Sequence, residues 1–227
     1  MKIRKNLRHL RAKKMKMKNL IYIIILLIIP SIGIAQSADA GAIIEKASRI
    51  YKEWGGMEIK FAANIRSEKN GVSESFEGSI VMKNDKFVLK TPDMLIWFDG
   101  KTQWTYILRS EEVNLSTPTS DELRYLNPML ILQDPNKDFK VTYIGESTSA
   151  NAKSAHDVML TPKKKDDIEK MEIQIEKNTS LPVKLVVTMR YDIRSTVTIK
   201  EINASNPPDE TFTFPEAEYP GIEIIEL

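Results

Sequence analysis

"FEGSIVMKNDKFVLKTPDMLIWFDGKTQWTYILRSEEVNLS", residues 76–116, decides the fold, because apolar and polar side chains alternate along it in short runs. A period of two is typical of a strand with one buried and one wet face. Turn-forming residues separate the runs, so the stretch predicts consecutive antiparallel strands joined by hairpins. The apolar faces of the first two runs consist of Phe76, Ile80, Met82, Phe87 and Leu89.

The same alternation continues on both sides of this stretch. It recurs in residues 57–65, 139–143, 171–175, 183–191 and 193–199. Turns such as Lys69-Asn70-Gly71 separate neighbouring runs. The sequence therefore predicts one mainly β domain with about ten or eleven antiparallel strands.

A first amphipathic helix is expected over residues 39–54, with Asp39 as its N-cap and Gly55-Gly56 after its end. Its apolar face, at steps of three and four, consists of Ile43, Ala47, Ile50 and Trp54.

A second, shorter helix interrupts the strands between Thr117 and Gln133. Ser120 is its expected N-cap, and Pro128 must bend or restart it. Its apolar side consists of Leu123, Leu126, Met129 and Leu130. With this helix the chain has two short helices to cover a long sheet.

The N-terminus carries the features of a secretory signal peptide. Residues 1–35 contain nine basic side chains and no acidic one, followed by the apolar run Leu20–Ile29, Pro30 and Gly33-x-Ala35. We expect cleavage before Gln36, which leaves residues 36–227 as the domain. An uncleaved anchor is the alternative, although the run is shorter than the roughly 20 residues of a spanning helix. Met15 or Met17 are alternative starts with the same mature product.

Charge and cysteine content restrict the compartment and the partners. Removing the nine N-terminal basic residues leaves 24 of 33, against 31 acidic ones, so the domain is acidic. An acidic surface disfavours nucleic acid as a partner. The chain has no cysteine, so it forms no disulfide and carries no lipid on a cysteine of its own. A secreted domain without disulfides fits a periplasm-like space.

The strand pattern leaves two arrangements open, a sandwich of two sheets or one sheet curled on itself. Two short helices cover only part of a curled sheet, and the remainder is then either a packed core or an apolar cavity. Methionines are adaptable liners of such a cavity as well as ordinary core residues. The methionines concerned are Met82, Met94, Met129, Met159 and Met189.

Signs of catalysis or metal binding are weak. His156 is the one histidine after residue 35, and there is no Gly-x-Ser-x-Gly motif. A lone histidine without cysteines offers no multi-ligand metal site. We therefore expect no catalytic residue, metal or cofactor, and keep a secreted hydrolase as the least favoured alternative. The basic run Lys163–Lys165 is expected at a hairpin tip, with some attraction to anionic lipid headgroups.

The ordered series of motifs resembles that of the LolA family, the periplasmic carriers of outer-membrane lipoproteins. The residues that carry this resemblance are Gly78, Phe87, Pro92, Asp99-Gly100-Lys101, Trp104, Tyr106, Asn127-Pro128, Leu130 and Leu132. It continues more weakly through residues 158–166 and 209–227, and so covers nearly the whole mature chain.

The resemblance implies a single large antiparallel sheet curled into an incomplete β-barrel, with short helices as a lid over an apolar cavity. It further implies a monomeric carrier that takes the acyl chains of triacylated lipoproteins from an inner-membrane ABC-type complex to an outer-membrane acceptor. The residues expected to line the cavity are Ile43, Ile50, Phe61, Ile80, Met82, Phe87, Leu89, Met94, Ile96, Trp104, Tyr106, Leu108, Leu126, Met129, Leu130, Leu132 and Met159.

Two features modify this expectation. Asp99-Gly100 is a hairpin turn, after which Trp104 is expected to point into the cavity, with Trp97 beside it or on the outer face. The family's lid arginine is absent from the segment Met82–Asp85, where Lys83 is the candidate latch. A carrier of another lipid, or an envelope-stress sensor with the same fold, is the alternative function.

Overall fold

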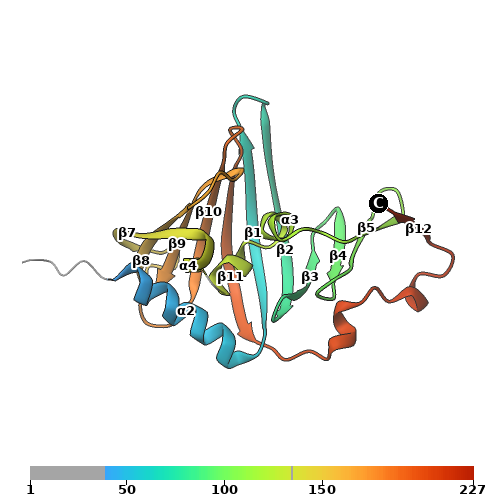
Figure 1. The fold of residues 1–227 in the computed structure, drawn as a ribbon, viewed down its shortest axis with the longest axis horizontal. Coiled ribbons are helices and arrows are strands. Elements are labelled where there is room, and N and C mark those ends of the chain that lie inside the picture. Colours follow the sequence, from blue (N-terminus) through green and yellow to red (C-terminus); the bar gives the residue numbers. More distant parts are fainter. Residues whose placement is uncertain (1–38, 134) are drawn as a thin grey trace, which may run out of the picture. The chain divides into compact units, whose positions relative to one another are not determined.

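The computed structural model describes residues 39–133 and 135–227, drawn in colour in Figure 1. The predicted signal peptide, residues 1–35, lies outside them. The described residues form one compact unit. Among the described residues, no helix is long and apolar enough to cross a membrane.

A single twelve-stranded sheet forms the domain, in the order β12-β6-β5-β4-β3-β2-β1-β11-β10-β9-β8-β7. The sheet is curled and unclosed, as predicted, because β12 and β7 remain as its two edges. Every pair of neighbours is antiparallel except β12 with β6. The strands are β1 (Met57–Ser67), β2 (Val72–Lys83), β3 (Lys86–Lys90), β4 (Met94–Phe98), β5 (Gln103–Ile107), β6 (Glu112–Ser116), β7 (Phe139–Thr148), β8 (Ser154–Pro162), β9 (Ile168–Glu176), β10 (Pro182–Met189), β11 (Arg194–Ala204) and β12 (Glu223–Glu226).

The helices are α2 (Ala40–Trp54), α3 (Ser120–Leu126), η1 (Pro128–Gln133), α4 (Pro135–Asp138), η2 (Asp209–Phe212) and η3 (Glu216–Glu218). The predicted ends of α2 are confirmed. Asp39 Oδ1 accepts a hydrogen bond from Gly41 N at 2.9 Å, and Gly55 adopts φ 70°. The predicted face is confirmed at Ala47, which is buried, but its centre shifts toward Ile44, which is fully buried while Ile43 and Ile50 are only half-buried.

The second helix differs from its prediction at one end. Thr119, rather than Ser120, is the N-cap of α3, since its side chain and that of Glu122 form a capping box. Pro128 restarts the chain as η1, as expected.

The two faces of the sheet have separate cores. We call the face that packs against α2, α3 and η1 the inner face, and the opposite one the outer face. The outer face of β3–β6 is covered by the C-terminal segment, residues 206–222. Figure 1 shows the chain leaving β11 and running past β3 and β4 to reach β12. The ring centroids of Trp97 and Phe214 lie 5.3 Å apart in this second core.

Candidate functional site

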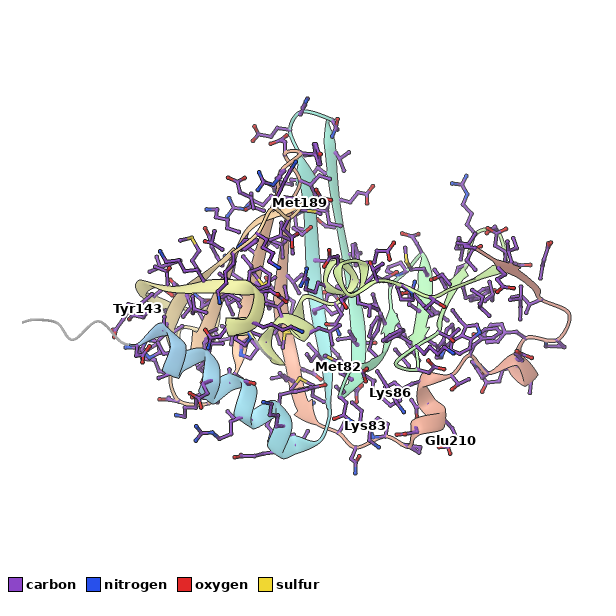
Figure 2. The ribbon with its side chains drawn as sticks, viewed as in Figure 1. Met82, Lys83, Lys86, Tyr143, Met189 and Glu210 are labelled. Carbon is purple, nitrogen blue, oxygen red and sulfur yellow. The ribbon has the colours of Figure 1, made fainter. Side chains whose placement is uncertain are left out.

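An apolar cavity of about 190 Å³ lies on the inner face. Strands β1, β2, β3 and β9–β11 supply its walls, and α3 with η1 lies over it. Its apolar lining consists of Ile59, Phe61, Ala63, Ile65, Phe76, Ile80, Leu89, Leu126, Met129, Ile168, Leu185, Val187, Met189, Val197 and Ile199. Figure 2 labels Met189 on this wall. The cavity is thus part of the sheet's own apolar face.

Small residues at the centre of the sheet leave this space open. Ala63 lies on β1 and pairs directly with Phe76 on β2. Phe61 pairs with Gly78, where an added Cβ would come within 2.7 Å of the Phe61 ring and 2.6 Å of Lys90 O. Gly78 therefore lets the Phe61 ring lie flat against β2, beside Phe76 at a centroid distance of 6.4 Å.

An ion-pair cluster ties α3 to its surroundings beside the cavity. The Arg124 guanidinium contacts the carboxylates of Asp121, Asp138 and Asp166, the last two at 3.2 Å. It also lies 5.8 Å from the centre of the Phe139 ring. Because Asp138 belongs to α4 and Asp166 to the β8–β9 connection, Arg124 links three segments. The pair of Arg124 with Asp166 is largely buried on both sides and is less screened than a surface pair, whereas Asp121 and Asp138 are exposed.

The structure places the predicted cavity residues in three groups. Five line the cavity itself: Phe61, Ile80, Leu89, Leu126 and Met129. Seven belong to the inner core beside it: Ile43, Met82, Phe87, Met94, Ile96, Leu130 and Leu132. The other five, Ile50, Trp104, Tyr106, Leu108 and Met159, are in neither set.

The strand register explains two of these five corrections, Trp104 and Tyr106. Trp104 pairs with Trp97 and Tyr106 with Leu95, whereas Ile96 is on the inner face, so both aromatic rings belong to the outer core. The expectation that Trp104 points into the cavity is wrong.

The three remaining residues are displaced for other reasons. Met159 lies between Val158 and Leu160, which face inward, so it faces outward. Leu108 follows the end of β5 and is 40% exposed. Ile50 lies at the edge of the buried face of α2, and Ile44 lies at the middle of that face.

Lys83 also differs from its expected place. It follows Met82 on β2 and therefore points to the outer face, where its Nζ lies 3.0 Å from Pro207 O and 3.1 Å from Asp209. Lys86 contacts the same carboxylate at 2.8 Å. Figure 2 shows both lysines beside the segment that carries Glu210. Lys83 thus fastens the C-terminal segment, and the prediction that it latches a helix over the cavity is wrong.

Several lining residues were recognised as strand faces without being assigned to a cavity. Leu185, Val187, Val197 and Ile199 are examples, and their alternation was the available signal. Arg124 was not identified, because a charged residue on a short helix gives no signal of a buried role. Within residues 39–133 and 135–227, no group of three or more acidic or histidine side chains is placed to hold a metal ion. His156 Nδ1 lies 3.3 Å from the Tyr143 hydroxyl.

A curled, unclosed antiparallel sheet with an apolar cavity beneath short helices defines the LolA-like class of folds. The chain belongs to the family of the outer membrane lipoprotein carrier protein LolA, whose sequence model matches residues 31–190. It is a divergent member, because the solved structures it resembles share little sequence with it. A search of curated proteins found no match.

Three solved structures illustrate the likeness. An uncharacterized conserved protein from Thermus thermophilus is 11% identical, with a TM-score of 0.52 over 83% of this chain and 99% of that one. A LolA superfamily protein from Nitrosomonas europaea is 12% identical, with a TM-score of 0.46 over 78% and 98%. MucB in the Pseudomonas aeruginosa MucA/MucB complex is 14% identical, with a TM-score of 0.38 over 79% and 62%. At these identities the first structure supports the fold alone.

Proposed function

We propose that the protein is a periplasmic carrier that holds the acyl chains of lipoproteins in the inner-face cavity and moves them from the inner to the outer membrane. The observation that carries this proposal is the cavity, which is lined mostly by aliphatic and aromatic side chains. Each acyl methylene exposed to water costs about 0.8 kcal/mol, so a lipidated protein needs such a shelter to cross an aqueous space. No covalent chemistry is required of the carrier.

The size of the cavity indicates how loading works. Its volume of about 190 Å³ is below the roughly 300–1,000 Å³ of typical ligand sites, so a full acyl chain needs more room. The sheet walls are held by continuous ladders, whereas α3 and η1 are short and rest on side-chain contacts. We infer that α3 and η1 move outward on loading.

The partners proposed for this transport are those that the resemblance to the LolA family implies. The cargo is a triacylated lipoprotein, the donor an inner-membrane ABC-type releasing complex and the recipient an outer-membrane acceptor, with the carrier acting as a monomer. Because the carrier must both accept and release its cargo, the loaded and empty states differ by only a modest free energy.

Depletion in the native cell tests this proposal. When the protein is depleted, outer-membrane lipoproteins should accumulate in the inner-membrane fraction, and a plasmid copy should restore sorting. A plasmid copy carrying Ala63→Leu, which narrows the cavity, should restore it poorly, and Ala62→Leu on the outer face should restore it fully. Unchanged lipoprotein sorting after depletion would contradict the proposal. Phospholipids without lipoproteins bound to the purified protein would point to another lipid cargo.

A further inference from the structure

Two residues that line the apolar cavity each carry a buried hydrogen-bond donor without a partner among the described residues. Four polar residues contribute to its lining: Thr91, Arg124, Asn127 and Ser195. The Thr91 hydroxyl is occupied, since it bonds both the amide and the carbonyl of Met94 at 3.2 Å. Arg124 Nε and Asn127 Nδ2 are buried and have no partner within the described part of the chain. An unmade bond at a buried donor is costly, so a ligand that satisfies both gains affinity.

The Arg124 side chain is held so that only Nε remains available. Its terminal nitrogens contact the three aspartates, and the ring of Phe139 lies beside the guanidinium. The side chain therefore cannot turn Nε elsewhere without breaking these contacts.

Asn127 is held in a similar way. Its Oδ1 accepts a hydrogen bond from Met129 N at 3.2 Å, which fixes the orientation of the amide, because a flipped amide would set two donors against each other. The residue is 1% exposed, and its Nδ2 carries two donors. Positions 124 and 127 are one helical turn apart, so both donors belong to the same side of the α3 end.

We propose that Arg124 Nε and Asn127 Nδ2 bind the carbonyl oxygen of an ester or amide at the head of an acyl chain. The acyl tail then runs along the apolar wall of the cavity. This inference rests on the proposed function, because it assigns a polar anchor to the same cavity. It also names a ligand class, acyl groups in neutral ester or amide linkage.

The surrounding charges disfavour a free fatty acid. Arg124 carries one positive charge, and the three aspartates around it carry three negative ones. An additional carboxylate at Nε would be repelled by these neighbours, whereas a neutral carbonyl is not. The site thus separates esterified acyl chains from free fatty acids of equal length.

Competition against a fluorescent acyl ester tests the anchor on the whole mature protein. The competitors are hexadecane, methyl palmitate and palmitate, which share a sixteen-carbon chain and differ at the head group. After correction for aqueous solubility, methyl palmitate should bind about tenfold more tightly than hexadecane. This difference in affinity corresponds to about 1.4 kcal/mol. Palmitate should bind more weakly than the methyl ester.

Two conservative variants locate the effect. Arg124→Lys keeps a positive charge for the aspartates and removes Nε, and Asn127→Asp keeps the acceptor for Met129 N and removes the donors. Each should lower the ratio of ester affinity to hydrocarbon affinity, because one of the two donors is lost, and the double variant should bring that ratio close to one. Asn64→Asp is the matched control and should leave the ratio unchanged, because Asn64 bonds Ser75 outside the cavity at 2.7 Å.

The results distinguish the anchor from the carrier function. Equal binding of hexadecane and methyl palmitate by the wild type would overturn the anchor and leave the carrier intact. Binding of neither would overturn both. Tighter binding of palmitate than of its ester would overturn the charge argument. The wild-type series decides these points even where a variant fails to fold.

Discussion

Ala63→Leu should stabilise the protein and weaken acyl binding at the same time. Ala63 is buried and lines the cavity on β1. Leucine adds three carbons, whose burial is worth up to about 2.4 kcal/mol. Loss of side-chain entropy offsets about 0.5–1 kcal/mol of that. The net gain of about 1.5–2 kcal/mol corresponds to a rise in Tm of roughly 3–8 °C for a domain of this size.

The same carbons occupy the space of about three acyl methylenes. Losing their burial costs about 2.4 kcal/mol, so affinity for a long acyl ester should fall about 50-fold. The best-bound chain should also become about three carbons shorter. Thermal unfolding and a displacement series of methyl esters from ten to eighteen carbons measure the two effects separately.

Ala62→Leu is the matched control, because Ala62 pairs with Glu77 and Thr198 on the outer face. Its effect on stability should stay within about 0.5 kcal/mol, with normal binding. The reasoning would be refuted if Ala63→Leu lowered stability by more than about 1 kcal/mol, as overpacking does, while acyl binding remained normal. That result would mean that the inner face is closely packed and the ligand lies elsewhere.

Three further perturbations test other parts of the structure. Gly56→Ala would place a Cβ 2.5 Å from Met82 O and 2.7 Å from Ser205 O, so urea unfolding should show a loss of at least about 2 kcal/mol; a loss below about 0.5 kcal/mol would contradict this packing. Phe214→Ala should cost about 3–5 kcal/mol and shift the emission of Trp97 to the red, while the folded fraction still binds acyl esters; an unshifted spectrum would argue against the outer core. Hydrogen bonds from Lys86 and Lys83 lower the pKa of Asp209 below 3.8, so its contribution to stability is present above that pH and is lost as the pH falls through the lower folded pKa. The urea concentration at half-unfolding should therefore fall less steeply in Asp209→Asn than in the wild type as the pH is lowered from about 5 to about 2. An equally steep fall in both proteins would exclude this contact.

The inner face could be predicted because its signal is local. Met57, Ile59 and Phe61 alternate with Glu58 and Lys60 on β1. Their neighbours Met82, Ile80 and Phe76 share one face of β2. The succession of antiparallel strands and the turn at Gly55 followed from such short-range patterns. The pattern left a sandwich open, and the single curled sheet was implied by the resemblance to the LolA family.

The outer core could not be predicted in the same way. Both faces of β3 and β4 are apolar. The pattern therefore does not say whether Trp104 lies on the same face of the sheet as Ile96 or on the same face as Trp97. The answer depends on Phe212 and Phe214, which lie more than a hundred residues later in the chain and cover the outer face. A segment that packs on strands so far away in the sequence leaves no periodic pattern in the sequence of those strands.

The ambiguity of α2 has a simpler cause. Ile43 and Ile44 are adjacent, so the apolar stripe fits either register, and tertiary packing selects Ile44. The polar anchor was hidden for a different reason. Arginine and asparagine are ordinary residue types at the end of a helix. Only their burial beside an apolar cavity distinguishes Arg124 and Asn127.

Photo-crosslinking with a synthetic triacylated lipopeptide tests the central claim most directly. The probe carries a diazirine midway along one acyl chain, and peptide mass spectrometry maps the adducts on the protein. Adducts should concentrate on inner-face residues of β1, β10 and β11 and on Met129 of η1, and Ala63→Leu should reduce them. Adducts confined to the outer core around Trp104 and Phe214, or no saturable adducts, would contradict the claim that the inner-face cavity carries acyl chains.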